Sequence, residues 1–194
     1  DDKDVALDPE MLGRVFENLL ASFNPETSTT ARKATGSYYT PREIVDYMVD
    51  ESLKSYLRES LTHIPDLEHK LGWLFADLDD ENPFSNVQTM QIIKAIENVR
   101  IVDPAVGSGA FPMGALHRMV SILSKLDPGS QLWKQAQLDA AENIPDPQIR
   151  EQVQASITNY FLEKNPDYGR KLFLIQKCIY GVDIQPIAVE IAKL

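Results

Sequence analysis

Arg100-Ile-Val-Asp-Pro-Ala-Val-Gly-Ser-Gly-Ala-Phe111 is the stretch of the sequence that decides the fold. Its beginning predicts a short buried strand of β-branched residues, Val99, Ile101 and Val102. Pro104 ends this strand because proline has no N–H for a strand ladder. Gly107 and Gly109 then permit a tight turn that exposes backbone N–H groups. A helix is predicted next from apolar residues at helical spacing, namely Met113, Leu116, Met119, Val120 and Leu123.

The order of strand, acidic residue, small-residue loop and helix narrows the type of ligand. In an open α/β sheet such a loop lies at the carboxyl end of a strand, where ligands bind. A phosphate loop requires Gly-Lys-Ser/Thr, which the sequence lacks, and a dinucleotide loop requires a glycine where Pro112 stands. Asp103 would repel a pyrophosphate but attract a cation. The loop therefore suits S-adenosylmethionine, which has an ammonium, a sulfonium and no phosphate; the simpler alternative is a tight turn with a solvated Asp103.

The segment from Asp103 to Phe111 also resembles motif I, the cofactor motif of amino-group DNA methyltransferases. The likeness is to the adenine-N6 enzymes of restriction–modification systems, and among them to large single-chain enzymes of the type IIG kind. This resemblance implies S-adenosylmethionine as the cofactor. It also implies a set of cofactor-binding residues on this loop: Asp103, Ala105, Gly107, Ser108, Gly109 and Phe111.

A second organised stretch is Gly36-Ser-Tyr-Tyr-Thr-Pro41. Thr40 can cap a helix that begins at Pro41, with Glu43 completing a Thr-x-x-Glu capping box. Free N–H groups at such a helix start can receive a ligand carboxylate, although on periodicity alone the capped helix is structural. The stretch resembles motif X of the same family, whose Tyr-Thr-Pro segment covers the methionine end of the cofactor. The resemblance implies that Tyr39, Thr40 and Pro41 are cofactor neighbours.

The third stretch, Cys178-Ile-Tyr-Gly-Val-Asp183, predicts a second strand that ends in an acid, and Pro186 opens the last helix. A carboxylate at this strand end can bind both ribose hydroxyls of a nucleoside, and Ile184 can pack on adenine. The segment from Gly181 onward resembles motif II. The gap between glycine loop and acid exceeds the usual ~20 residues. Residues 127–170, which include a turn at 127–129, are therefore interpreted as a helical insertion that leaves the two strands adjacent.

Together these patterns predict an α/β fold: a partial, helix-rich, Rossmann-like methyltransferase fold with few parallel strands and helical insertions. Residues 1–35 are expected to form an N-terminal helix and linker, because Leu12 to Leu20 resembles the helix that precedes the methyltransferase domain. Residues 36–194 are expected to be the N-terminal portion of that domain, with motifs in the γ-type order X, I, II. Two further helices are predicted within 65–98, and Ser85 with Gln88 is expected to cap the second of these two. Other helices are predicted over 131–141, from Pro147 onward, and up to about Gln176.

Asn165-Pro-Asp-Tyr168 differs by one residue from the Asn-Pro-Pro-Tyr motif that adenine-N6 methyltransferases use in catalysis. In the motif order of this chain, however, the catalytic motif follows a later strand and is expected beyond Leu194. The tetrapeptide is therefore interpreted as a turn between helices, and no catalytic residue is assigned. The resemblance implies a parent enzyme that flips adenine out of duplex DNA and methylates it, whereas this chain, which has no initial Met, is expected to be an inactive fragment.

Composition sets further bounds on the protein. The 194 residues are 43% hydrophobic and 25% charged, as in ordinary globular domains. No apolar run approaches the roughly 18 residues of a membrane span, and a single cysteine excludes an internal disulfide and fits the cytoplasm. His63, His69 and His117 lack metal-ligand spacing, so no metal is expected. The net charge of −10 implies that double-stranded DNA would be bound mainly by other parts of the parent protein.

Two alternatives from other classes remain open. A non-enzymatic helical module could bind a protein partner through its acidic surface. A nicotinamide-dependent dehydrogenase is a second alternative, against which Pro112 and Asp103 argue.

An incomplete sheet would expose an apolar edge, so self-association is also expected. The DNA target, a nuclease domain, the assembly state and cofactor binding by this chain alone are not determined by the sequence.

Overall fold

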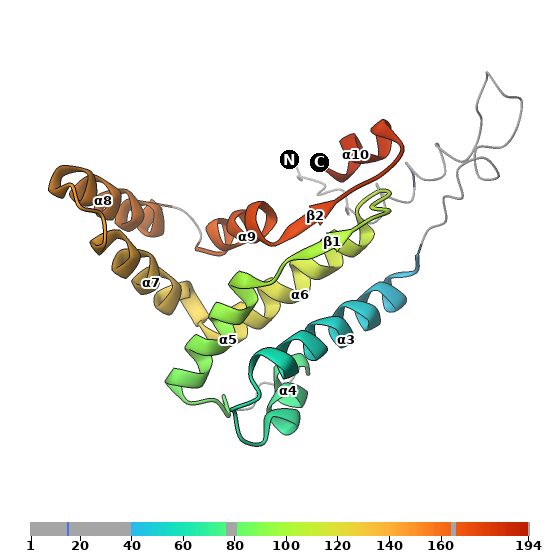
Figure 1. Ribbon diagram of the computed structural model, residues 1–194, viewed down its shortest axis with the longest axis horizontal. Coiled ribbons are helices and arrows are strands. Elements are labelled where there is room, and N and C mark those ends of the chain that lie inside the picture. The colour runs from blue at the N-terminus through green and yellow to red at the C-terminus, as the bar shows by residue number, and fades with distance from the viewer. Residues whose placement is uncertain (1–14, 16–39, 77–80, 164–165, 194) are drawn as a thin grey trace, which may run out of the picture. The chain divides into compact units, whose positions relative to one another are not determined.

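The structure is a computed structural model, which describes residue 15 and residues 40–76, 81–163 and 166–193. Tyr39, Leu194 and most of the predicted N-terminal helix and linker lie outside these residues. Figure 1 shows the elements in chain order. They are α3 (Arg42–Ser60), α4 (Leu67–Phe75), α5 (Asn86–Asn98), β1 (Ile101–Asp103), α6 (Ala110–Leu126), the 3₁₀ turn η1 (Pro128–Ser130), α7 (Gln131–Glu142), α8 (Pro147–Glu163), α9 (Pro166–Lys177), β2 (Ile179–Gly181) and α10 (Pro186–Ala192).

The chain divides into two compact units. We call the first the sheet unit; of the described residues, it contains those up to 49, Ile101–Ala115 and those from 179 onward. We call the second the helical unit; it contains Asp50–Arg100 and Leu116–Cys178. Helices α3 and α6 contribute residues to both units. No helix in the described part of the chain is long and apolar enough to cross a membrane.

In the sheet unit, β1 and β2 form a parallel pair (Figure 1). Val102 is the register partner of Tyr180, and Asp103 is the partner of Gly181. The ladder continues past both strands, because the Val182 N–H donates to the Asp103 carbonyl at 2.8 Å. The prediction that the two strands are neighbours in spite of the helices between them is confirmed. The observed sheet is small and parallel with helices beside it, as a partial α/β fold requires.

The start of α3 differs slightly from the prediction. The helix begins at Arg42, and the N–H groups of Ile44 and Val45 donate to the Pro41 carbonyl. Pro41 therefore precedes the first helical residue instead of being it. Val45 lies so close to Gly114 on α6 that a Cβ at Gly114 would be 2.7 Å from Val45 Cγ1. Only a glycine at position 114 lets the two helices approach this closely.

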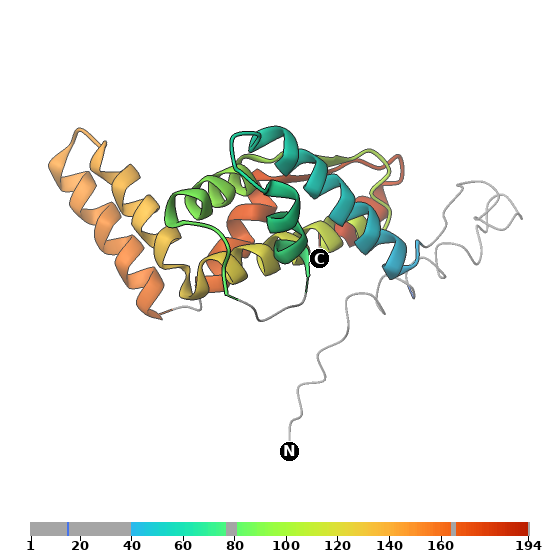
Figure 2. The same cartoon turned by 90° about the horizontal axis from the view of Figure 1, so that it is seen from below.

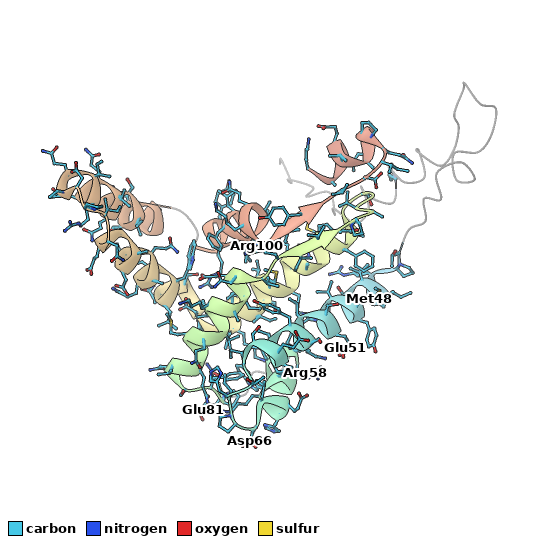
Figure 3. All side chains as sticks on the ribbon, viewed as in Figure 1. Met48, Glu51, Arg58, Asp66, Glu81 and Arg100 are labelled. Atoms are coloured by element: carbon cyan, nitrogen blue, oxygen red, sulfur yellow. The ribbon has the colours of Figure 1, made fainter. Side chains whose placement is uncertain are left out.

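The core of the helical unit is mostly apolar. Its most buried apolar side chains have less than 2% of their surface exposed and come from five helices and the residue before β2: Leu57, Leu71, Ile92, Ile96, Met119, Ile122, Leu123, Leu174 and Cys178. Burial on this scale is the main stabilising term for such a unit. At its surface, Arg58 on α3, which Figure 3 labels, donates to both carboxylate oxygens of Glu68 on α4 at 2.7 and 2.9 Å.

Two helices of the helical unit, α5 and α8, begin where the sequence predicts. Ser85 and Gln88 form the predicted capping box, with each side chain accepting a hydrogen bond from the other residue's N–H. Asp146 accepts from the first N–H groups of α8, which begins at Pro147 as predicted. The prediction of a turn at Asn165–Tyr168 is wrong for its last three residues. They form the first turn of α9, because proline fits the first position of a helix.

The described residues between 127 and 170 are helical apart from short connections, and α7 and α8 lie side by side in both views (Figures 1 and 2). The sequence predicts only a turn at Asp127–Gly129. In the structure Asp127 is buried, accepts from the N–H groups of Leu132 and Trp133 at the start of α7, and forms an ion pair with Arg170. The two ends of the segment are therefore joined by a charged contact that no local pattern indicates.

Candidate functional site at the carboxyl ends of the two strands

The candidate site lies in the sheet unit, where β1 and β2 end. Asp103 is the last residue of β1, and Asp183 follows β2 by two residues. Because the strands are parallel and in register, both acids come to the same edge of the sheet. The glycine loop, residues 104–109, leaves this edge and leads into α6. The structure thus brings the glycine loop and the segment after β2 together, although they are 76 residues apart at their point of contact.

Both acids bind the glycine loop directly. Asp103 Oδ1 accepts from the Ala105 N–H at 3.0 Å, and Asp183 Oδ2 accepts from the Gly107 N–H at 2.9 Å. Asp183 Oδ1 accepts in addition from the Gln185 N–H at 2.8 Å. Hydrogen bonds of an N–H group to a carboxylate are about twice as strong as neutral ones. The loop is therefore held by side chains from both strand ends.

Contrary to the expectation from the sequence, most N–H groups of the loop are bonded within the protein. Besides the two donors that bind carboxylates, the Val106 N–H donates to the Val182 carbonyl at 2.9 Å. The Gly109 N–H donates to the Val106 carbonyl at 2.8 Å. The positive φ angles of Gly107 and Gly109, 52° and 92°, produce this tight internal bonding. Four of the loop's donors are thus already used, and the loop is poorly suited to bind a phosphate through its amides.

The site instead offers hydrogen-bond acceptors. Asp103 Oδ2 is buried and has no hydrogen-bond partner among the described residues. A buried acceptor without a partner is costly, so this oxygen would gain from a ligand that donates. Each oxygen of Asp183 accepts one backbone hydrogen bond and keeps a second acceptor position. Two carboxylates in one site favour an ammonium and hydroxyl groups and disfavour an anion, which fits the donor groups of S-adenosylmethionine.

An exposed apolar residue stands beside these acids. Ile184 has 90% of its surface exposed although it is large and apolar, and Val182 is 57% exposed. Their exposure leaves an apolar surface directly beside Asp183. This arrangement suits a ligand with a flat apolar ring next to hydroxyl groups.

The remaining predicted residues differ in burial. Ser108 and Phe111 are half-buried, and Ala105 is exposed. Gly109 packs against Ala192 of α10, with 3.6 Å between the position of a Cβ and the Ala192 backbone. Thr40 is half-buried and Pro41 is exposed. The close approach of α3 and α6 at Val45 and Gly114 puts the start of α3 beside the start of α6.

Sequence reasoning missed the role of Val106 and Gly181. A Cβ at Gly181 would lie 2.6 Å from Val106 Cγ2, so only glycine lets the buried Val106 side chain pack over β2. This packing holds Val106 of the glycine loop against β2. Gly181 itself indicated this contact in the sequence, because a glycine inside an apolar strand often marks a close approach of another segment. Among the described residues, no three His, Cys, Asp or Glu side chains form a group that could hold a metal ion.

The chain is similar in sequence to a known protein. The chain is 30% identical, over 99% of its length, to a protein of Methanocaldococcus jannaschii named "Putative type II restriction enzyme and methyltransferase RM.MjaORFECS2P". The chain spans 14% of the length of that protein. No family model matches the sequence. No solved structure matches it either.

Proposed function

We propose that this chain carries the cofactor-binding part of an S-adenosylmethionine-dependent DNA methyltransferase of a restriction–modification system. The observation that carries the proposal is the pair of carboxylates, Asp103 and Asp183, that meet on a donor-poor loop at the ends of two adjacent parallel strands. The similarity to a protein named as both a restriction enzyme and a methyltransferase supports the same function.

Each residue has a role in this proposal. The unpartnered Oδ2 of Asp103 would accept from the cofactor's ammonium. The open acceptor positions of Asp183 would take the ribose hydroxyls, and Ile184 would pack on the adenine ring. Tyr39, Thr40 and Pro41, just before α3, would cover the methionine end. When bound, the cofactor supplies a methyl group activated by its sulfonium; the residues of this chain bind and orient it.

The finer assignment is to adenine-N6 methylation by an enzyme of type IIG-like organisation. It rests on the likeness of Asp103–Phe111 and Gly181–Ala188 to motifs I and II of that group. The target adenine would be flipped out of duplex DNA to reach the methyl group. We assign no catalytic residue to this chain, since Pro166, Asp167 and Tyr168 belong to α9. With a net charge of −10, the chain would leave most DNA contacts to other parts of the enzyme.

Calorimetric titration with S-adenosylhomocysteine tests the proposal. We expect binding to the protein and at least a tenfold loss of affinity in Asp103→Ala, because a hydrogen bond to a charged group contributes about 1.5–3 kcal/mol. Glu190→Gln, which removes an exposed carboxylate of α10 in the same unit, should bind as the unaltered protein does. Binding of NAD in preference to S-adenosylhomocysteine, or equal binding by Asp103→Ala, would contradict the proposal.

A further inference from the structure

Asp183 contacts two other segments of the sheet unit. Its Oδ2 accepts from the Gly107 N–H of the glycine loop at 2.9 Å. Asp183 is itself fixed, because its Oδ1 accepts from the Gln185 N–H at the start of α10. One side chain therefore ties the glycine loop, the end of β2 and α10 together.

The contact with Asp183 provides an acceptor for a backbone donor of the glycine loop. Gly107 has a φ of 52°, in the left-handed region, and its N–H has no other acceptor nearby in the loop's internal bonding pattern. Val106 and Gly109 bond to backbone carbonyls and Ala105 bonds to the nearby Asp103, so the Gly107 N–H is the loop donor that depends on a side chain far away in the sequence. Without Asp183, this N–H would be exposed to solvent. The hydrogen bond from the Val106 N–H to the Val182 carbonyl would remain between the loop and the segment after β2.

We propose that Asp183 is a positioning residue, which holds the glycine loop closed through the Gly107 N–H before the ligand binds and keeps that contact while it binds the ligand's ribose. The chemistry allows both tasks at once. Each carboxylate oxygen can accept two hydrogen bonds, one from the backbone and one from a hydroxyl. The loop-holding part stands on the contact itself, whereas the ribose part rests on the proposed function.

Selective labelling makes the loop contact measurable. Val106–Gly107 is the only Val-Gly step in the sequence, so protein labelled with ¹³C-carbonyl valine and ¹⁵N-glycine yields one filtered amide signal, that of Gly107. We expect slow hydrogen exchange at this amide in the ligand-free protein. In Asp183→Ala, exchange should be at least about tenfold faster, since a hydrogen bond to a charged group stabilises by about that factor or more. The matched variant Glu190→Gln should leave the signal and its exchange unchanged.

A cycle of variants and ligands separates positioning from ribose binding. The affinities of S-adenosylhomocysteine and its 2′,3′-dideoxy analogue are compared in the unaltered protein and in Asp183→Ala. A positioning role predicts that Asp183→Ala weakens the dideoxy analogue as well, because the loop is no longer preformed. If the substitution leaves the affinity of the dideoxy analogue unchanged, or if the ligand-free Gly107 amide exchanges equally fast with and without Asp183, the proposal is overturned.

The two proposals fail in different ways. If S-adenosylhomocysteine does not bind but the Gly107 amide depends on Asp183, the proposed function is wrong and the loop-holding role stands. If S-adenosylhomocysteine binds and the amide is indifferent to Asp183, the positioning role is wrong and the proposed function stands. Thermal unfolding of Asp183→Ala and Asp183→Asn is recorded alongside. The exchange result is read from the variant that remains folded.

Discussion

Asp127 Oδ2 lies 2.7 Å from Arg170 Nη2, and the two side chains are only 3% and 1% exposed. The pair joins the turn before α7 to α9 across 43 residues. The two residues differ in how many of their polar atoms have a hydrogen-bond partner. Asp127 also accepts from the N–H groups of Leu132 and Trp133, whereas Arg170 Nε and Nη1 have no hydrogen-bond partner among the described residues. The charge of the buried guanidinium therefore depends mainly on Asp127.

This asymmetry predicts the effect of breaking the pair. Asp127→Ala should lower the free energy of unfolding by about 3–5 kcal/mol, because it leaves Arg170 as an uncompensated buried charge and removes the cap of α7. Arg170→Met should cost less, since Asp127 keeps its two backbone donors. Urea unfolding measures both values. Asp146→Ala, which removes an exposed cap of α8, is the control and should cost only about 0.5–2 kcal/mol. Equal costs for Asp127→Ala and Arg170→Met would contradict the asymmetry.

Glu97 near this pair should make stability depend on pH. Burial raises the pKa of the Glu97 carboxyl above its ordinary value of 4.5, Arg170 acts in the opposite direction, and Asp127 adds to the rise. A raised pKa in the folded state means that the folded protein holds the proton more tightly. Stability is therefore lost as pH rises from about 4.5 through the folded pKa. Glu97→Gln should then be more stable than the unaltered protein at pH 7, with the difference vanishing at about pH 4. Lower stability of Glu97→Gln at pH 7 would show instead that Arg170 holds the ionised form.

Two helical glycines offer a matched test of packing. Gly72 on α4 has nothing within 4 Å of the position that an added methyl would take, so Gly72→Ala should stabilise by about 0.5–1 kcal/mol through helix propensity. Gly114→Ala gains the same propensity but puts its methyl 2.7 Å from Val45 Cγ1, and should destabilise by about 1–3 kcal/mol. Adding Val45→Ala should relieve the clash, so that the double variant is more stable than the sum of the single effects. Thermal unfolding of the four variants measures this, and a stabilising Gly114→Ala would refute the close approach.

The surface of the small sheet leads us to expect self-association. Val102 and Tyr180 are register partners, and they are 61% and 45% exposed. An apolar strand pair that is open to water is a site for pairing with another chain. The net charge of −10 opposes association, so the apparent mass in sedimentation should rise with protein concentration and more steeply at high salt. Val102→Lys should abolish the effect, and a monomer at all salt concentrations would contradict the expectation.

Local chemistry determined much of this structure from sequence alone. The Ser85–Gln88 capping box, the Asp146–Pro147 helix start and the strand–glycine–helix order each depend on residues within a few positions of one another. Such interactions form whatever the rest of the chain does, so a pattern in the sequence is enough to predict them. The resemblance of the motifs added the expectation that the two strands are neighbours, and the parallel pairing confirmed it.

The tertiary structure alone decided which distant groups meet. Asp183 could have faced solvent or a ligand only, but its contact with Gly107 uses a loop donor that the sequence predicted to be exposed. Asp127 could have been an ordinary turn residue, but Arg170 reaches it from α9. These contacts join residues 76 and 43 positions apart, and their geometry depends on how whole helices and strands pack. The sequence indicated where acids and glycines stand, and packing determined that the acids hold the loop.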